Sequence, residues 1–199
     1  GRHVRRGATL IAANRSHEDL VLNRKPDIGL QTDPGQFLID LAAAATSPLE
    51  DLSAWRKELA DRDAKREQDI DEDAARTGEL VNPLALCRGV NAALPDDSII
   101  VADGGDFVGT ASYIVHSRGP LRWLDPGVFG TLGVGAGFAL GAALCRPVAQ
   151  IWALFGDGSF GYSLAEFDTF VRHRIPIIAV IGNDGCWSQI AREQIKILK

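Results

Sequence analysis

The stretch Gly156-Asp157-Gly158-Ser159-Phe160 decides the fold that we expect for this chain of 199 residues. It directly follows an apolar run at 151–155, which has the composition of a buried parallel strand. The spacing of a capping box at 163–166 predicts a helix, which Pro176 ends before a second apolar run at 177–182. The order of strand, Gly-Asp-Gly turn, helix and strand predicts a right-handed crossover in an α/β fold with a parallel sheet.

Two aspartates are expected to meet at one edge of this sheet. Asp157 follows the first strand, and Asp184 follows the second strand 27 positions later. Because neighbouring parallel strands end at the same edge, the two carboxylates can lie close together. Glycines on both sides of Asp157 let a ligand approach the backbone, and the amino end of the following helix favours a phosphate group. A carboxylate beside a phosphate needs a hard cation between them, so we predict Mg²⁺ bound by both aspartates.

The same residues allow two other interpretations. Residues 156–161 also spell the G-x-G-x-x-G pattern of a dinucleotide-binding fold, and Asp184 stands where such a fold keeps its ribose-binding acid. That pattern alone is a weak signal, and Asp157 would then point an uncompensated negative charge at the pyrophosphate. A glycine turn that binds no ligand is the remaining alternative.

The composition argues against several classes of protein. The net charge is −5, which gives no indication of a nucleic-acid partner. The three cysteines are far apart and form no C-x-x-C pair, which disfavours a disulfide framework or a zinc site. No stretch reaches the roughly 20 apolar residues of a membrane span. A hydrophobic content of 46% fits a globular chain.

The chain is predicted to hold parts of two α/β domains joined by a charged helix. Residues 1–46 read as strand, loop and helix, with Asp33 as the cap of the helix and Pro34 at its first position. Residues 47–80 form the linker, which has a capping box at 47–50 and then the mixed charges of a solvated helix.

Residues 81–199 are predicted to start the second domain. Asn82 caps a helix, and an apolar strand at 98–102 follows it. The segment 103–107 leaves the carboxyl end of this strand, where open α/β sheets bind ligands. A glycine-rich loop at 123–133 then leads into a helix of alternating small residues, which lets it pack closely on the sheet.

Gly-Asp-Gly at 156–158, followed after the next strand by Asn183-Asp184, resembles the signature of the thiamine-diphosphate enzymes. With Gly-Thr-Leu-Gly at 130–133 upstream, the pattern is similar to the acetolactate-synthase-like branch, which includes the 2-hydroxyacyl-CoA lyases. The resemblance covers nearly the whole chain. It implies that 81–199 is the diphosphate-binding domain of such an enzyme, truncated at its carboxyl end, and that 1–46 is the tail of a central α/β domain.

The resemblance also implies a metal and cofactor site. It assigns Mg²⁺ to Asp157, Asp184 and the backbone carbonyl of Cys186. Leu132 becomes the apolar wedge that holds thiamine diphosphate in a bent shape, and the carbonyl of Gly130 accepts a hydrogen bond from its pyrimidine amino group. The full set of implied cofactor-binding residues is Gly105, Asp106, Phe107, Gly130, Leu132, Gly158 and Ser159.

Trp187 and Gln189 fall where relatives line the substrate pocket. From the residues alone, local packing explains these two equally well. Similarly, 105–107 could be a plain strand-to-helix turn, and Leu132 could be ordinary core.

The implied function is that of a thiamine-diphosphate- and Mg²⁺-dependent carbon–carbon lyase. In such enzymes the cofactor carries the chemistry and the protein orients it. We expect a 2-hydroxyacyl-CoA to be cleaved to a shortened aldehyde and formyl-CoA. The alternatives are an acetolactate synthase that joins pyruvate units and a non-catalytic homologue.

The chain is expected to hold only part of an active site. The family's catalytic glutamate lies in a separate amino-terminal domain and comes from the partner subunit, and no motif here matches it. We therefore predict no catalytic residue within this chain and no turnover by it alone. The resemblance implies a homodimer or homotetramer with an active site shared between subunits. The animal members imply an endoplasmic reticulum membrane location, with the anchor outside this chain, and a cytoplasmic location is the alternative.

Overall fold

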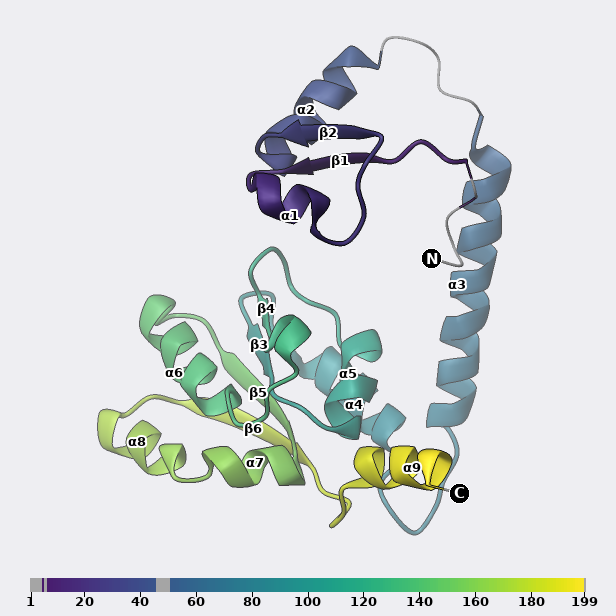
Figure 1. Ribbon diagram of the computed structural model, residues 1–199. Coiled ribbons are helices and arrows are strands. Elements are labelled where there is room, and N and C mark those ends of the chain that lie inside the picture. Colours follow the sequence, from purple (N-terminus) through teal and green to yellow (C-terminus); the bar gives the residue numbers. More distant parts are fainter. Residues whose placement is uncertain (1–4, 6, 46–50, 199) are drawn as a thin grey trace. The chain divides into compact units, whose positions relative to one another are not determined.

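The computed structural model describes residue 5 and the ranges 7–45 and 51–198 (Figure 1). The chain divides into two compact units, Gly1–Glu58 and Leu59–Lys199. The capping box expected at 47–50 lies outside the described residues. Within the described ranges, no helix has both the length and the apolar character needed to cross a membrane.

The first unit contains a small parallel sheet. Strands β1 (Ile11–Asn14) and β2 (Ile28–Gln31) pair in parallel, with α1 (His17–Leu22) between them and α2 (Pro34–Ala44) after them. The α2 cap is as predicted, since Asp33 Oδ1 accepts a hydrogen bond from the backbone N–H of Gln36 at 3.0 Å. Helix α1 lies where the sequence predicts a loop, because a helix of six residues is too short to show a period.

Helix α3 (Ser53–Ala74) lies within the predicted linker at 47–80 and crosses the boundary between the two units. Its second part packs on α4 (Pro83–Ala93), where Ile70 enters a core cluster and is only 8% exposed. Arg88 of α4 bonds the carboxylates of Glu67 and Asp71 at 2.7 and 2.8 Å. Ile70 and Arg88 thus attach the second part of α3 to α4, although the mixed charges of this helix predict that it is fully solvated.

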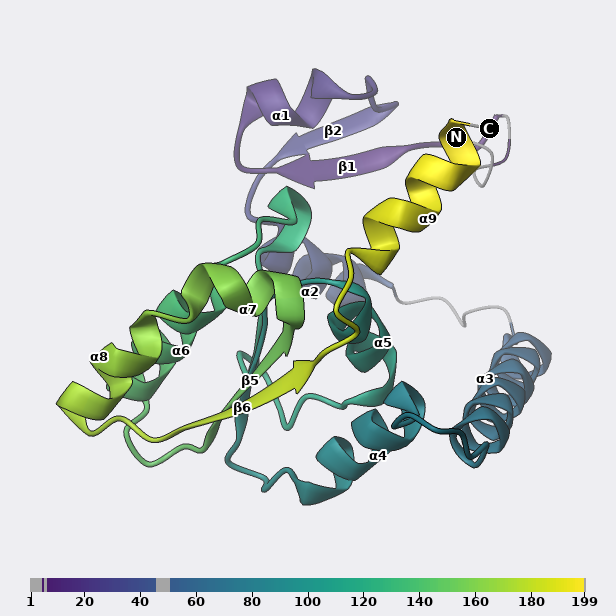
Figure 2. The ribbon, with the colours of Figure 1, turned by 90° about the horizontal axis from the view of Figure 1, so that it is seen from below.

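The second unit is a four-stranded parallel sheet with helices on both faces (Figure 2). Its strands lie in the order β4 (Trp123–Leu124), β3 (Ile99–Ala102), β5 (Ile151–Gly156) and β6 (Ile177–Gly182). The apolar runs predicted as strands are therefore confirmed, and the two strands that precede Asp157 and Asp184 are parallel neighbours.

Alternation along the strands builds two core clusters. Ile100 and Ala102 of β3 pack with α4 and α5 (Asp106–Ile114), whereas Ile99 and Val101 face α6 (Gly135–Cys145) and α8 (Glu166–His173). Successive side chains of a strand point to opposite faces, so one fully buried strand serves both layers.

Helix α7 (Asp157–Ser163) begins directly at the end of β5, without the separate Gly-Asp-Gly turn that we expected. The predicted capping box at 163–166 is wrong as well. Ser163 ends α7, and its hydroxyl donates to the carbonyl of Gly133 at 3.1 Å. The N-cap of α8 is Ala165, which makes no side-chain cap hydrogen bond. A tertiary partner thus takes the hydroxyl that the local pattern assigned to capping.

The small residues of α6 divide by face. Ala136, Ala139 and Ala142 are buried against the sheet. A Cβ atom added to Gly135 would lie 2.6 Å from the Phe155 ring, so close packing requires glycine there. At the other two glycines of the helix, 137 and 141, an added Cβ would meet nothing within 4 Å. The prediction of close packing therefore holds for one face of α6 and not for these two glycines.

Candidate cofactor site

A cleft of about 1070 Å³ lies where β3, β5 and β6 end. Parallel strands bring their carboxyl ends to one edge, so segments far apart in the sequence meet there. All twelve predicted site residues line this cleft: Gly105, Asp106, Phe107, Gly130, Leu132, Asp157, Gly158, Ser159, Asp184, Cys186, Trp187 and Gln189. The structure thus brings the predicted set together, while the ligand role of each residue stays a prediction.

The two predicted metal-binding carboxylates are tied to one loop. Asp157 Oδ2 accepts from the backbone N–H of Gly185 at 3.1 Å. Asp184 accepts from the N–H of Cys186 at 2.9 Å and from the hydroxyl of Ser188 at 2.6 Å. These bonds fix the loop after β6 against the start of α7, so both carboxylates are held in place.

The turn itself depends on Asn183 and Gly185. The side-chain carbonyl of Asn183 accepts from the N–H of Gly185 at 3.0 Å, which confirms the expectation that Asn183 fixes the turn. Gly185 has a φ of +64°, a left-handed conformation that favours glycine.

The donor set of the cleft fits Mg²⁺ shared with a diphosphate. Among the described residues, no three His, Cys, Asp or Glu side chains form a group that could hold a metal by themselves. Two carboxylates alone leave a hard cation short of ligands, so carbonyl and phosphate oxygens must complete its shell. The predicted set of Asp157, Asp184 and the Cys186 carbonyl leaves room for such phosphate oxygens.

The amino end of α5 provides a place for the anion. Its N-cap, Gly105, has a φ of +97° and makes no side-chain cap hydrogen bond. The first N–H groups of the helix therefore have no side-chain partner from the cap, and the helix dipole adds positive potential there.

Ser159 and Leu132 both line the cleft. The Ser159 hydroxyl donates to the carbonyls of Gly104 and Gly156 at 3.1 and 3.0 Å, and the residue is only 2% exposed. Its side chain thus joins the ends of β3 and β5 and does not point at a ligand. A Cβ atom added to Gly104 would lie 2.2 Å from Leu132 Cδ2, so Leu132 packs directly over the turn after β3.

Asp103 holds the glycine-rich loop, a role that was not predicted from the sequence. The residue is 3% exposed, and its carboxylate accepts from the N–H groups of Gly133 and Gly135 at 2.9 and 2.7 Å. These bonds fix the end of the loop that carries Gly130 and Leu132. The sequence feature that could have predicted this role is an acid directly after a buried apolar strand, where an unpaired charge is costly.

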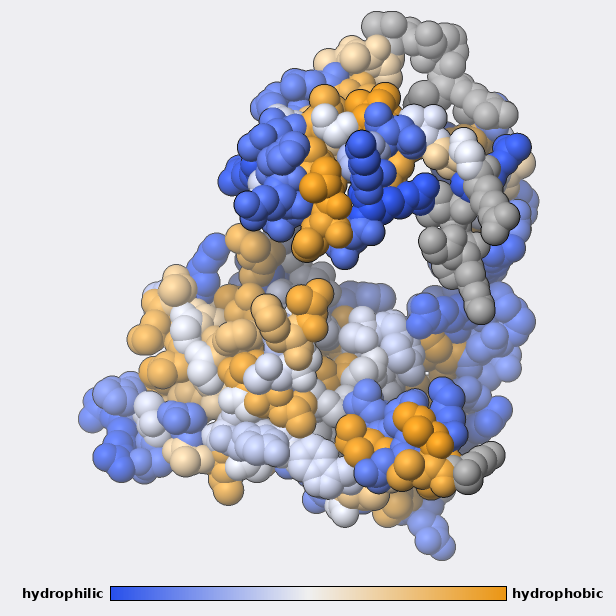
Figure 3. Space-filling model, viewed as in Figure 1, coloured by the Kyte–Doolittle hydropathy of each residue, from blue (hydrophilic) through white to orange (hydrophobic). Residues whose placement is uncertain are grey.

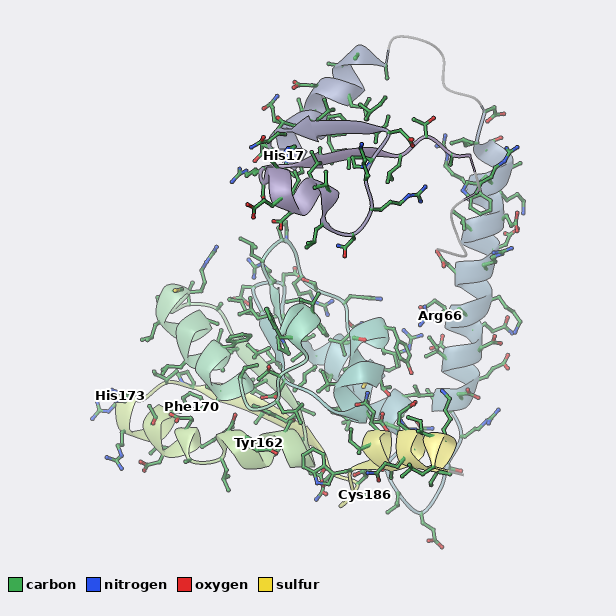
Figure 4. The ribbon with its side chains drawn as sticks, viewed as in Figure 1. His17, Arg66, Tyr162, Phe170, His173 and Cys186 are labelled. Carbon is green, nitrogen blue, oxygen red and sulfur yellow. The ribbon has the colours of Figure 1, made fainter. Side chains whose placement is uncertain are left out.

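Trp187 covers the start of α7. A Cβ atom added to Gly158 would lie 2.7 Å from the Trp187 ring, and the Tyr162 ring lies 6.5 Å from it. Tyr162 of α7 and Cys186, the neighbour of Trp187, are labelled in Figure 4. Trp187 is 50% exposed, so it forms part of the mouth of the cleft.

Helix α9 (Ser188–Ile197) was not predicted, although Ile190, Gln194 and Ile197 recur at helical spacing. It brings Arg192 to the cleft, where the guanidinium pairs with the carboxylate of Asp106.

Comparisons with known proteins define the class of this domain. Residues 103–197 match the family model described as thiamine pyrophosphate enzyme, C-terminal TPP binding domain. Residues 103–197 thus form a C-terminal domain of the thiamine pyrophosphate enzyme family, and thiamine diphosphate is the cofactor of this domain. The resemblance read from the Gly-Asp-Gly motif is confirmed, and the dinucleotide interpretation loses its support.

Three named relatives show which thiamine pyrophosphate enzymes this chain is similar to. The chain is 52% identical to 2-hydroxyacyl-CoA lyase 2 of Bos taurus and 51% identical to the Homo sapiens protein of the same name, in each case over 100% of this chain and 32% of the relative. A probable acetolactate synthase of Mycobacterium bovis is 39% identical over 77% of this chain and 28% of the relative. The chain thus spans about one third of the length of the lyases that it matches.

Proposed function

We propose that this chain supplies the diphosphate- and Mg²⁺-binding part of a thiamine-diphosphate-dependent lyase that cleaves a 2-hydroxyacyl-CoA to a shortened aldehyde and formyl-CoA. The cleft that joins Asp157, Asp184 and the α5 amino end is the observation that carries this proposal. When bound, the cofactor supplies the carbon–carbon bond chemistry, and the residues of this chain bind and orient it.

In this proposal the cleft has a metal end and a ring end. Asp157, Asp184 and the Cys186 carbonyl bind Mg²⁺, which neutralises the diphosphate. The N–H groups at Gly105, Asp106 and Phe107, together with the backbone at Gly158 and Ser159, receive the phosphate oxygens. The uncapped amino end of α5 supports the assignment of its N–H groups. The Ser159 hydroxyl already bonds two backbone carbonyls, which supports a role for the backbone of this residue and not for its side chain.

The ring end is formed by the glycine-rich loop. Leu132 supports the bent cofactor, and the carbonyl of Gly130 accepts from its amino group. Trp187 and Gln189 line the space for the substrate. The anchoring of this loop by Asp103 supports a rigid platform for the ring system.

Identity along the whole chain favours the lyase over the acetolactate synthase. The lyase relatives match all of this chain at about half identity, and the mycobacterial synthase matches less of it at 39%. We also propose a homo-oligomer in which another subunit supplies the catalytic glutamate, so this chain alone has no turnover. An endoplasmic reticulum location remains our expectation.

The test uses the complete protein with thiamine diphosphate and Mg²⁺. A 2-hydroxyacyl-CoA and pyruvate are offered separately, and formyl-CoA, aldehyde and acetolactate are measured. Formyl-CoA from the first substrate supports the lyase, and acetolactate from pyruvate alone would select the synthase.

Cofactor binding is tested in parallel. Asp157→Ala should abolish Mg²⁺-dependent binding of thiamine diphosphate, because it removes one of two side-chain ligands. Asp168→Ala is the matched control, since its carboxylate pairs with Arg172 on the surface of α8. Binding that is indifferent to both Mg²⁺ and Asp157 would refute the assignment of the metal site.

A further inference from the structure

The ion pair between Arg192 and Asp106 joins two elements of the cleft wall. Arg192 belongs to α9, Asp106 is the first residue of α5, and both line the cleft. The pair is bidentate, because Nη1 and Nη2 of the guanidinium each face one oxygen of the carboxylate. Such fork-to-fork pairs fix orientation as well as distance.

Within the described ranges, α9 makes few other contacts that would hold it on the domain. None of its described residues is buried, and Ile190, Ile195 and Ile197 are 53%, 66% and 73% exposed. Figure 3 shows hydrophobic surface over α9. At its amino end, the hydroxyl of Ser188 bonds Asp184. Apolar burial therefore does not fix α9 on the described domain, and its polar contacts with the cleft residues do.

The position of Asp106 presents an electrostatic conflict. Its carboxylate stands in the first turn of α5, whose N–H groups are the proposed site of the diphosphate. A lone carboxylate there would repel the anion. Arg192 lies against it, and the hydrogen bond to Asp106, followed by the charges of Asp106, Glu193 and Asp184, raises the pKa of the guanidinium, which therefore stays a cation.

We propose that Arg192 makes the α5 end of the cleft accept a diphosphate, because it cancels the charge of Asp106 and clasps α9 beside the bound group. This inference rests on the proposed function, since it takes the diphosphate to lie at the amino end of α5. Arg192 is a positioning residue in this role, and it acts through Asp106.

Substitutions of Arg192 and of Asp106 should weaken thiamine diphosphate binding to different extents, whereas a purely structural clasp would give equal losses. Arg192→Gln leaves the Asp106 carboxylate uncompensated, so it should weaken thiamine diphosphate binding roughly three- to tenfold. Asp106→Asn breaks the same clasp but also removes the repulsive charge, so its loss of affinity should be clearly smaller than that of Arg192→Gln. The double variant should match Asp106→Asn.

The experiment measures the dissociation constant of thiamine diphosphate for the complete protein at saturating Mg²⁺, followed by tryptophan fluorescence. Inorganic diphosphate with Mg²⁺ serves as a competing probe, and its affinity should fall in Arg192→Gln by a similar factor. The effect should shrink when salt is raised from about 20 mM to about 0.5 M, because screening weakens exposed charges. Lys196→Gln is the matched control, since it removes another cation of α9, one that pairs with Glu193.

Each outcome decides the inference. Stronger loss in Arg192→Gln than in Asp106→Asn, dependent on salt and seen with both probes, supports it. Equal loss in the two single variants shows a structural clasp without the electrostatic role and overturns it, as does an unchanged affinity in Arg192→Gln. A wild-type protein that binds no thiamine diphosphate would overturn the proposed function as well, whereas a binding wild type with indifferent variants rejects the role of Arg192 alone.

Discussion

The buried carboxylate of Asp103 offers the sharpest test of how the cleft is built. Each of its oxygens accepts one N–H of the glycine-rich loop, at 2.9 Å from Gly133 and 2.7 Å from Gly135. A hydrogen bond to a charged acceptor contributes about 1.5–3 kcal/mol. Asp103→Asn keeps one acceptor and turns an amide N–H₂ group towards the other donor, so the loop should lose about 1.5–3 kcal/mol of local stability.

Hydrogen exchange measured by mass spectrometry on the complete protein can follow this loop directly. Opening should become roughly ten- to hundredfold more frequent for peptides that cover 130–135, since about 1.4 kcal/mol corresponds to a factor of ten. Asp103→Ala should have the larger effect, because both donors lose their partner. Thiamine diphosphate binding should weaken in both variants, since the loop carries Gly130 and Leu132.

Asp97→Asn is the control for this substitution, because Asp97 is exposed just before the same strand. Its exchange pattern should equal that of the wild type. If Asp103→Asn leaves exchange at 130–135 unchanged, the carboxylate does not anchor the loop and the argument fails.

Three further predictions concern the cleft and the core. Gly158→Ala places a Cβ atom 2.7 Å from the Trp187 ring, so the ring should move into solvent. We expect red-shifted tryptophan emission and weaker cofactor binding, with little change in melting temperature. A large fall in melting temperature without the spectral shift would contradict this prediction. The hydrogen bond from Arg88 lowers the pKa of Glu67, so this ion pair stabilises the fold at neutral pH and is lost as the pH falls below 4.5 towards the lowered pKa. Arg88→Met at pH 7, and acid in the wild type, should therefore both speed hydrogen exchange in residues 59–74. Protection that persists in both cases would rule out this ion pair as the anchor of the helix. Burial raises the pKa of the Cys87 thiol from 9.0 to about 11, so the unfolded chain releases this proton first and the free energy of unfolding should fall as the pH rises from 9 to 11. Urea unfolding should show a smaller fall of this free energy in Cys87→Val than in the wild type. Equal falls in both proteins would exclude the thiol as the cause.

Much of the second unit could be predicted because its signals are local. Short apolar runs between turn residues are typical of buried strands of a parallel sheet, and Asn82 before Pro83 marks a helix start by its own chemistry. Since the crossover rule sends consecutive parallel strands to the same edge, the sequence also predicted that Asp157 and Asp184 would face one cleft.

Two of the failures share one physical cause, which is a polar group that finds its partner far away in the sequence. Ser163 looked like a helix cap, but it bonds the carbonyl of Gly133, 30 residues earlier. Asp103 looked like part of a turn, but it binds N–H groups 30 and 32 residues later. Local patterns cannot rank such partners, because the competition is decided only when the strands and loops have assembled.

The sequence by itself determined the class of fold, the strand ends that carry the two aspartates and the cofactor that the motif implies. These features depend on residue spacing and on the hand of the chain, which are fixed before folding. Only the tertiary structure decided that Asp103 anchors the glycine-rich loop and that Arg192 meets Asp106 across 86 positions. Burial sets the first contact, because an acid without a partner is costly in a water-poor interior. The second contact joins two partly exposed side chains that lie side by side only after α5 and α9 have taken their places in the fold.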